Sequence, residues 1–392
     1  VPETTPAPTS RHARMTLSPL GLYIHLPWSE KKCPYCDFNS HERQDLPETA
    51  YVATLLADLE QESVTLPRQI DTIFIGGGTP SLFSASAVHE LLDGIRQRVE
   101  VAADAEITME ANPGSSELDR FAGYREAGVN RFSLGVQSFH DAALSRLGRV
   151  HNSGEARSAI AMVQRAKPRS FNVDLMHGLP EQTAEDGLAD LQSAVETNPP
   201  HLSWYQLTIE PNTRFYKYPP LLPDEPLLGE LEDWGSELLR SAGYQRYEVS
   251  AWAHPGAECR HNLNYWRFGD YLAIGAGAHG KVTTETGEIL RYAKTRRPED
   301  YMRSGGVDRR NIRQLTSAEL PGEFAMNALR LTEGFSRELF EERTGLKSNV
   351  IEPLVEQLQE QGLLVSDADV RATPLGYRFL DDVIGRFFDL EA

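Results

Sequence analysis

The residues of this chain best suited to chemistry are two cysteines, Cys33 and Cys36, in the segment Cys-Pro-Tyr-Cys. Two thiols at this spacing can exchange disulfides, form half of a zinc site or hold an iron–sulfur cluster. Ser29 occupies the position where a third cysteine would complete a CxxxCxxC pattern. No second CxxC pair or nearby pair of histidines completes a zinc site. The tetrapeptide alone leaves all three kinds of chemistry open.

The elements that must position this loop are short apolar runs that alternate with helical patterns. The expected strands are Leu22–Leu26, Thr72–Ile75, Glu106–Glu110, Arg131–Gly135, Ser170–Met176 and Leu202–Leu207. Apolar residues at helical spacing lie between them, from Tyr51 to Leu59, from Val88 to Val99, and in the windows Glu117–Glu126, Ser153–Arg165 and Ala184–Thr197. Six such repeats predict an α/β fold with a parallel sheet, two repeats short of an eightfold barrel.

Small and polar residues follow several of these strands, at the edge where such folds place their functional sites. The segment Gly76-Gly77-Gly78-Thr79-Pro80 follows the second strand and predicts an anion-binding nest of backbone N–H groups, or a plain tight turn. Glu110 ends the third strand, where it is either solvated or satisfied by a ligand. Gln137 and Asp174 end the next two strands, and Arg149 lies between them.

The segment from Leu22 to Ser40, and the order of motifs over nearly the whole chain, resemble the HemW haem-chaperone family of the radical S-adenosylmethionine (SAM) superfamily. In that superfamily three thiolates hold a [4Fe-4S] cluster whose open iron binds SAM. The resemblance implies a radical-SAM partial (β/α)6 TIM-like barrel, with Cys33 and Cys36 as cluster ligands and Ser29 at the first ligand position. A hydroxyl is a much poorer iron ligand than a thiolate, so we expect a cluster to be held weakly or not at all.

The resemblance also implies a SAM site, because GGGTP matches the family's SAM-binding loop. In the related coproporphyrinogen oxidases, the residues that match Gln137, Arg149 and Asp174 surround a second SAM. A strand-end amide and a surface Arg–Asp pair are the structural alternatives for these three. The residues expected to bind SAM are Tyr23, Tyr35, Gly77, Gly78, Thr79, Glu110, Gln137, Arg149 and Asp174.

A second motif, Cys-Arg-His-Asn-Leu-Asn-Tyr-Trp, runs from Cys259 to Trp266. An imidazole beside two aromatic rings suits haem, because a neutral histidine nitrogen ligates iron and aromatic rings pack on the macrocycle. The HNxxYW segment is linked to haem binding in HemW-like proteins. We therefore expect haem at His261, Tyr265 and Trp266. Cys259 is an alternative ligand or an inert buried thiol.

Phe38 separates two sister families, because the oxidases carry a fourth cysteine at this position. The resemblance therefore favours a haem-binding chaperone that delivers haem to client haemoproteins, rather than an enzyme. An oxygen-independent coproporphyrinogen III oxidase-like enzyme is the first alternative, and a CxxC thiol oxidoreductase is the second. The expected cofactors are haem, SAM and a [4Fe-4S] cluster of doubtful occupancy.

Composition limits the partners and the compartment. The net charge of −18 disfavours nucleic acid and anionic membranes as default partners. No apolar run is long enough to span a membrane, which leaves peripheral contact open, and three cysteines do not make a secreted disulfide framework. We expect a cytoplasmic protein whose oligomeric state and client the sequence does not reveal.

Four segments are expected along the chain. These are a disordered tail at 1–15, the radical-SAM core at 16–245, an extension with the HNxxYW segment at 246–310, and a HemN-type C-terminal domain at 311–392. In the last segment, helices at Ala325–Leu331, Arg337–Thr344 and Val350–Gln361 and a hairpin at 362–373 predict an α+β winged-helix-like domain. From Leu320 onward, the sequence contains 7 Lys or Arg residues and 14 Asp or Glu residues. This domain should repel a nucleic-acid duplex, so we expect a lid or a partner-docking surface.

Overall fold

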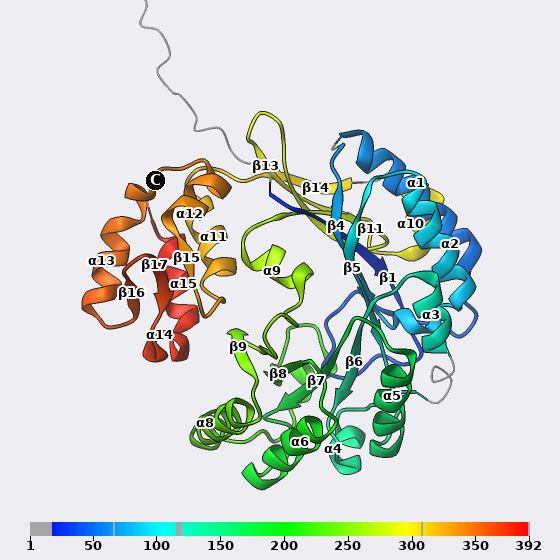
Figure 1. Cartoon of the computed structure of the whole chain (residues 1–392), viewed down its shortest axis with the longest axis horizontal. Helices are drawn as coiled ribbons and strands as arrows, with labels where there is room; N and C mark the ends of the chain where they lie inside the picture. The colour runs from blue at the N-terminus through cyan, green and yellow to red at the C-terminus, as the bar shows by residue number, and fades with distance from the viewer. Residues whose placement is uncertain (1–17, 66, 115–119, 307–308, 391–392) are drawn as a thin grey trace, which may run out of the picture.

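The computed structural model describes residues 18–65, 67–114, 120–306 and 309–390, and the tail predicted at 1–15 lies outside them. A twelve-stranded sheet forms the centre of the molecule (Figure 1). All six predicted strands lie side by side in it and run parallel. In spatial order they are β1 (Leu20–Leu26), β4 (Ile70–Gly77), β5 (Val101–Ala111), β6 (Arg131–Gln137), β7 (Ser170–His177) and β8 (His201–Gln206).

Helices follow these strands and cover the outer face of the curved sheet (Figure 1). Several of them begin at a side-chain cap. The Asn152 and Thr183 side chains, for example, each close a capping box with an acidic residue three positions on. Their apolar faces complete the core with the strands. The helices are α1 (Glu48–Thr65), α2 (Ala85–Arg96), α3 (Phe121–Ala127), α4 (Asp141–Arg146), α5 (Ser153–Ala166), α6 (Ala184–Glu196) and α8 (Glu225–Ser241).

Residues 245–314 extend both edges of the sheet, which the sequence did not predict. At one edge β11 (Asp270–Ile274) pairs parallel with β1 and is followed by antiparallel β12 (His279–Thr283), β13 (Ile289–Lys294) and β14 (Arg309–Gln314). At the other edge β10 (Ala251–Ala253) and β9 (Gln245–Glu248) add antiparallel strands to β8. The extension and the core therefore share one sheet.

Buried charges tie this extension to the first helix. The Lys294 ammonium on β13 lies 2.5 Å from an oxygen of Asp58 and 2.7 Å from one of Glu62, both on α1. All three side chains are buried. Because an unpaired charge is costly to bury, these contacts hold α1 in place behind the strand that precedes the cysteine loop.

The C-terminal part packs around a core of its own beside the sheet (Figure 1). The predicted helices are present as α11 (Leu320–Ala328), α12 (Arg337–Thr344) and α13 (Glu352–Glu360), and the predicted hairpin as β16 (Leu364–Ser366) and β17 (Asp369–Ala372). A third strand, β15 (Phe335–Ser336), joins β17, and α14 (Pro374–Arg378) and α15 (Leu380–Phe388) follow. Phe324, Phe335 and Phe340 meet edge to face at the centre of this core.

Candidate functional site

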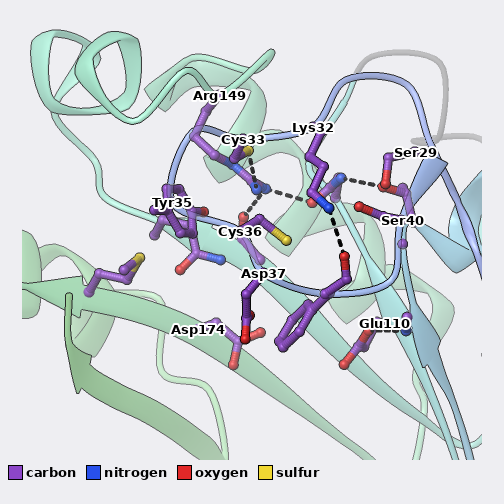
Figure 2. A pocket seen from close by; sticks show the side chains of 18 of the residues that line it. Ser29, Lys32, Cys33, Tyr35, Cys36, Asp37, Ser40, Glu110, Arg149 and Asp174 are labelled. Atoms are coloured by element: carbon purple, nitrogen blue, oxygen red, sulfur yellow. Dashed lines mark hydrogen bonds between the residues drawn. The ribbon is translucent and has the colours of Figure 1, made fainter. Parts of the chain in front are cut away.

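A cavity of about 550 Å³ opens at the carboxyl ends of the parallel strands, as the rule for such folds predicts. It gathers residues from the cysteine loop and from the ends of β4, β5, β6, β7 and β8, and Figure 2 shows part of its lining. The expected residues that line it are Ser29, Cys33, Tyr35, Cys36, Gly77, Gly78, Thr79, Glu110, Gln137, Arg149 and Asp174.

The cysteine loop lies between two short paired strands, β2 (Trp28–Ser29) and β3 (His41–Glu42). Within it, the Cys36 amide donates to the Cys33 carbonyl over 3.1 Å, which closes a turn and turns both thiols to the cavity. Burial raises the pKa of the Cys36 thiol. At the end of the loop, the Asn39 carbonyl contacts the His25 imidazole over 2.8 Å, and the Asn39 amide donates to the Ala276 carbonyl over 2.9 Å. The loop is thus fastened to both the core and the extension.

Ser29 is buried in the wall of the cavity beside the glycine loop. A Cβ added to Gly78 would lie 2.9 Å from the Ser29 hydroxyl oxygen and would also meet the Trp28 carbonyl. Among the residues that the structure describes, no three His, Cys, Asp or Glu side chains form a ligand set for a metal ion. Two thiols and a hydroxyl therefore do not fit a cluster that needs three thiolates.

The glycines of the loop at residues 76–79 let segments of the chain itself pack closely together, and their amides do not form an anion site. The amides of Gly77, Gly78 and Thr79 donate to the Glu110 carboxylate over 3.1 Å, to the Leu26 carbonyl over 2.8 Å and to the Trp28 carbonyl over 2.7 Å. The predicted nest of free N–H groups is therefore wrong, because these donors are already used. At Gly77 the backbone has φ +121°, and a Cβ would lie 2.8 Å from the His25 ring.

Two carboxyl groups face each other across the cavity. Burial, with a smaller contribution from Asp174, raises the pKa of Glu110 to about 7. Burial also raises the pKa of Asp174, although Ser133 and Asn172 donate hydrogen bonds to it over 3.1 Å and 2.7 Å. Near neutral pH, Glu110 is therefore close to its own midpoint and can change its ionisation when a ligand binds.

Arg149 joins the cysteine loop to the strand ends. Its guanidinium donates to the Asn112 side-chain oxygen over 2.5 Å, to the Gly135 carbonyl over 2.8 Å and to the Cys33 sulfur over 3.6 Å (Figure 2). Asn112 was not among the residues expected at the site, although it follows the strand that carries Glu110.

A second strand-end contact brings in a residue that was also missed. Gln137 has a left-handed backbone (φ 69°), and its side chain accepts a hydrogen bond from the Tyr205 hydroxyl over 2.8 Å. Tyr205 lines the same cavity. Strict alternation along β8 was the only signal that could have pointed it inward.

Tyr23, the remaining residue expected at SAM, does not line the cavity. Its hydroxyl contacts the His25 imidazole over 2.9 Å, and its ring lies 6.3 Å from the Phe74 ring. Tyr23 therefore contacts the cysteine loop only through His25, which in turn contacts Asn39 in that loop.

The HNxxYW segment forms α9 (Arg260–Trp266), which lies against β1, β4 and β11 at the amino-terminal end of the barrel. His261 is fully buried there. Its two ring nitrogens contact the Thr72 hydroxyl over 2.8 Å and the Tyr265 hydroxyl over 2.7 Å. Burial lowers the pKa of His261 to about 3, so the ring is neutral. The haem assignment stays a prediction, and it now requires that one ring nitrogen give up its hydroxyl partner.

The neighbours of His261 are equally enclosed. Cys259 is buried and contacts the Glu106 carboxylate over 3.5 Å, and burial raises the pKa of its thiol to about 12. The Arg330 guanidinium lies 4.4 Å above the Trp266 ring, so α9 also contacts the C-terminal part. His261 contacts Thr72 and Glu106, which precede the strand ends that line the cavity.

Comparison with known proteins agrees with this architecture. Residues 23–194 match the Radical SAM superfamily, and residues 315–379 match the HemN C-terminal domain. The structure of coproporphyrinogen III oxidase (HemN) from Escherichia coli superposes with a TM-score of 0.79 over 96% of this chain and 92% of that one, at 22% identity, which shows a shared fold. The fold and the cavity thus define a radical-SAM protein with a HemN-type C-terminal domain.

Sequence relatives narrow the class further. The chain is 52% identical to "Heme chaperone HemW" of Escherichia coli (strain K12) over 374 residues, which cover 95% of this chain and 98% of that protein. It is 36% identical to "Radical S-adenosyl methionine domain-containing protein 1, mitochondrial" of Bos taurus, over 97% of this chain and 88% of the relative. The chain belongs to the HemW family. In the part of the chain that the structure describes, no helix is long and apolar enough to cross a bilayer.

Proposed function

We propose that this chain is a haem-binding chaperone that passes haem to client haemoproteins and that its cavity receives SAM. The observation that carries the proposal is the 52% identity, over nearly the full length of both chains, to a protein named as a heme chaperone. Phe38 supports it, because the resemblance places the fourth cysteine of the oxidases at this position, where this chain carries an exposed phenylalanine.

The cavity suits SAM in its dimensions and in its polar groups. Gly77 and Gly78 line one wall, and the Glu110 and Asp174 carboxylates can accept hydrogen bonds from ribose hydroxyls or an ammonium group. Tyr35 supplies an aromatic ring beside them. SAM brings an electrophilic sulfonium centre to such a site.

The side chains do not fit a stable cluster, so the proposal assigns no step to iron–sulfur chemistry. Two thiols, Cys33 and Cys36, remain, and Ser29 replaces the third. SAM is then held by its periphery alone. A cytoplasmic location belongs to the same proposal, and the net charge of −18 argues against nucleic acid as a partner.

The test is haem binding followed by haem transfer. The full chain is titrated with ferric haem, and the loaded protein is mixed with increasing concentrations of an apo-haemoprotein while the Soret band is followed. Direct delivery predicts a transfer rate that keeps rising with acceptor concentration, whereas passive release predicts a plateau at the dissociation rate. Absence of haem binding, or a plateau, would contradict the proposal. Decarboxylation of added coproporphyrinogen III would favour the oxidase alternative.

A further inference from the structure

An exposed aromatic segment lies next to the cysteine loop. Residues 214–222, which we call the strap, comprise the short helix α7 (Arg214–Lys217) and the extended chain after it. Phe215 and Leu222 anchor the strap by packing into a small core under the cavity. Between these anchors, Tyr216, Tyr218 and Leu221 are 59%, 64% and 78% exposed. Three large apolar side chains within six residues thus face outward without cover.

The strap touches the cysteine loop directly. The Phe215 amide donates to the Pro34 carbonyl over 2.9 Å, and the Phe215 ring lies 6.4 Å from the Tyr35 ring. On another side of the loop, a Cβ added to Gly148 would lie 2.8 Å from the Pro34 ring, which places the exposed Val150 nearby. Phe38 is exposed within the loop itself. Apolar side chains therefore surround the loop on the outside.

Positive charge accompanies these aromatic rings. Arg214 and Lys217 are exposed on the strap, and the Lys217 ammonium lies 5.4 Å from the centre of the Tyr218 ring. Neither cation forms a salt bridge within the described residues. Lys31 and Lys32 of the cysteine loop line the neighbouring cavity. Free cations beside exposed aromatic rings are unexpected on a chain with a net charge of −18.

We propose that the strap is a haem-docking face, an inference that rests on the proposed function. Haem is a flat apolar ring with two carboxylates at one edge. Tyr216, Tyr218 and Leu221 offer the apolar contact, and Arg214 and Lys217 offer cations for the propionates. A tyrosine phenolate is also a known ligand of ferric haem. Unlike the imidazole of the HNxxYW segment, these groups need no rearrangement to reach haem.

The experiment compares ferric haem titrations of the full chain and its variants, followed by the Soret band. Changing Tyr216→Ala and Tyr218→Ala together should weaken haem binding about tenfold or more. Trp234→Ala on α8 is the control, because Trp234 is a half-exposed aromatic residue that lies outside the strap. The control should bind haem as the unmodified chain does, which excludes general adsorption to surface aromatic rings.

Further variants separate stacking, ligation and charge. Tyr216→Phe with Tyr218→Phe keeps the rings, so a loss of affinity with a shifted Soret band identifies a phenolate ligand. Arg214→Gln with Lys217→Gln should weaken binding and reduce its dependence on salt.

The outcomes distinguish this inference from the proposed function. If the unmodified chain binds no haem, the proposed function itself fails. If the unmodified chain binds haem and the double alanine variant binds it equally well, the strap inference is overturned. A His261→Ala variant that alone abolishes binding would then assign haem to the HNxxYW segment.

Discussion

Glu110→Gln is the substitution whose effects the structure predicts most directly. The Glu110 carboxylate accepts the Gly77 amide and faces Asp174 across the cavity. Burial raises its pKa from the ordinary value of 4.5 to about 7. Glutamine keeps an oxygen acceptor for the same amide but carries no charge. The variant therefore removes the ionisation and little else.

The sign of the effect follows from the direction of the shift. Because the pKa of Glu110 is higher in the folded chain than in the unfolded chain, stability is greatest at low pH and is lost as the pH rises through about 7. A shift of this size destabilises the folded chain by at most about 3 kcal/mol above the folded pKa. Between about pH 6 and pH 8, the loss of unfolding free energy caused by Glu110 grows by about 1.4 kcal/mol. Water in the cavity screens the carboxylate and reduces this figure. Glu110→Gln should recover this amount.

The assay is urea unfolding of the ligand-free chain near both pH values, beside SAM titration calorimetry. The variant should be more stable, by a margin that widens with pH. It should also bind SAM about tenfold more weakly near pH 8, because an ionised acceptor is lost. Glu356→Gln, at an exposed position on α13, is the control and should change neither. A stability gain that is equal at both pH values, or a loss that widens with pH, would refute the reasoning.

Three further substitutions test other parts of the site and its support. Ser29→Cys should retain about four irons and four sulfides after anaerobic reconstitution and desalting, and should then bind SAM more tightly; equal iron retention by the unmodified chain would contradict this. Gly78→Ala should lower SAM affinity and the urea midpoint together, because the added methyl group meets the Trp28 carbonyl; unchanged SAM binding would show that the loop has room to shift. Lys294→Met should lower the free energy of unfolding by about 3 kcal/mol, because the buried Asp58 carboxylate loses its cation while Glu62 keeps Arg309, whereas the exposed control Lys347→Met should change it by less than about 0.5 kcal/mol; equal losses would mean that the buried charges are not coupled.

The parallel core was predictable because its strands are buried on both faces and their apolar runs stand out. The added strands at the edges were not, because they carry charges that the sequence cannot pair. Lys281 sits in the middle of β12, where its ammonium meets the Phe268 carbonyl over 3.0 Å and the Asp270 carboxylate over 3.3 Å. Lys294 in β13 likewise depends on carboxylates from α1. Only the folded chain brings these partners together.

The cavity was predictable for a different reason. Residues that follow parallel strands meet at one edge, so Glu110 and Asp174 were expected together before any contact was known. Hydrogen-bond partners were not predictable. Nothing in the sequence indicates that Glu110 occupies the Gly77 amide, or that Thr72 and Tyr265 occupy the ring nitrogens of His261. The motifs therefore predicted which residues lie at the site. The packing of the folded chain determines which of their atoms are free to bind a ligand.

The proposed position of haem on the strap agrees with what a carrier must do, which is to release its cargo to another protein. Ligation by His261 would take one ring nitrogen away from its present partner, the hydroxyl of Thr72 or of Tyr265, and a buried polar group left unsatisfied costs about 1–3 kcal/mol. Release from that position would also require α9 to move from between the sheet and the C-terminal part. The strap needs neither step, because its aromatic rings and cations already face outward. A client haemoprotein can approach haem there directly, which favours transfer by contact over diffusion of free haem.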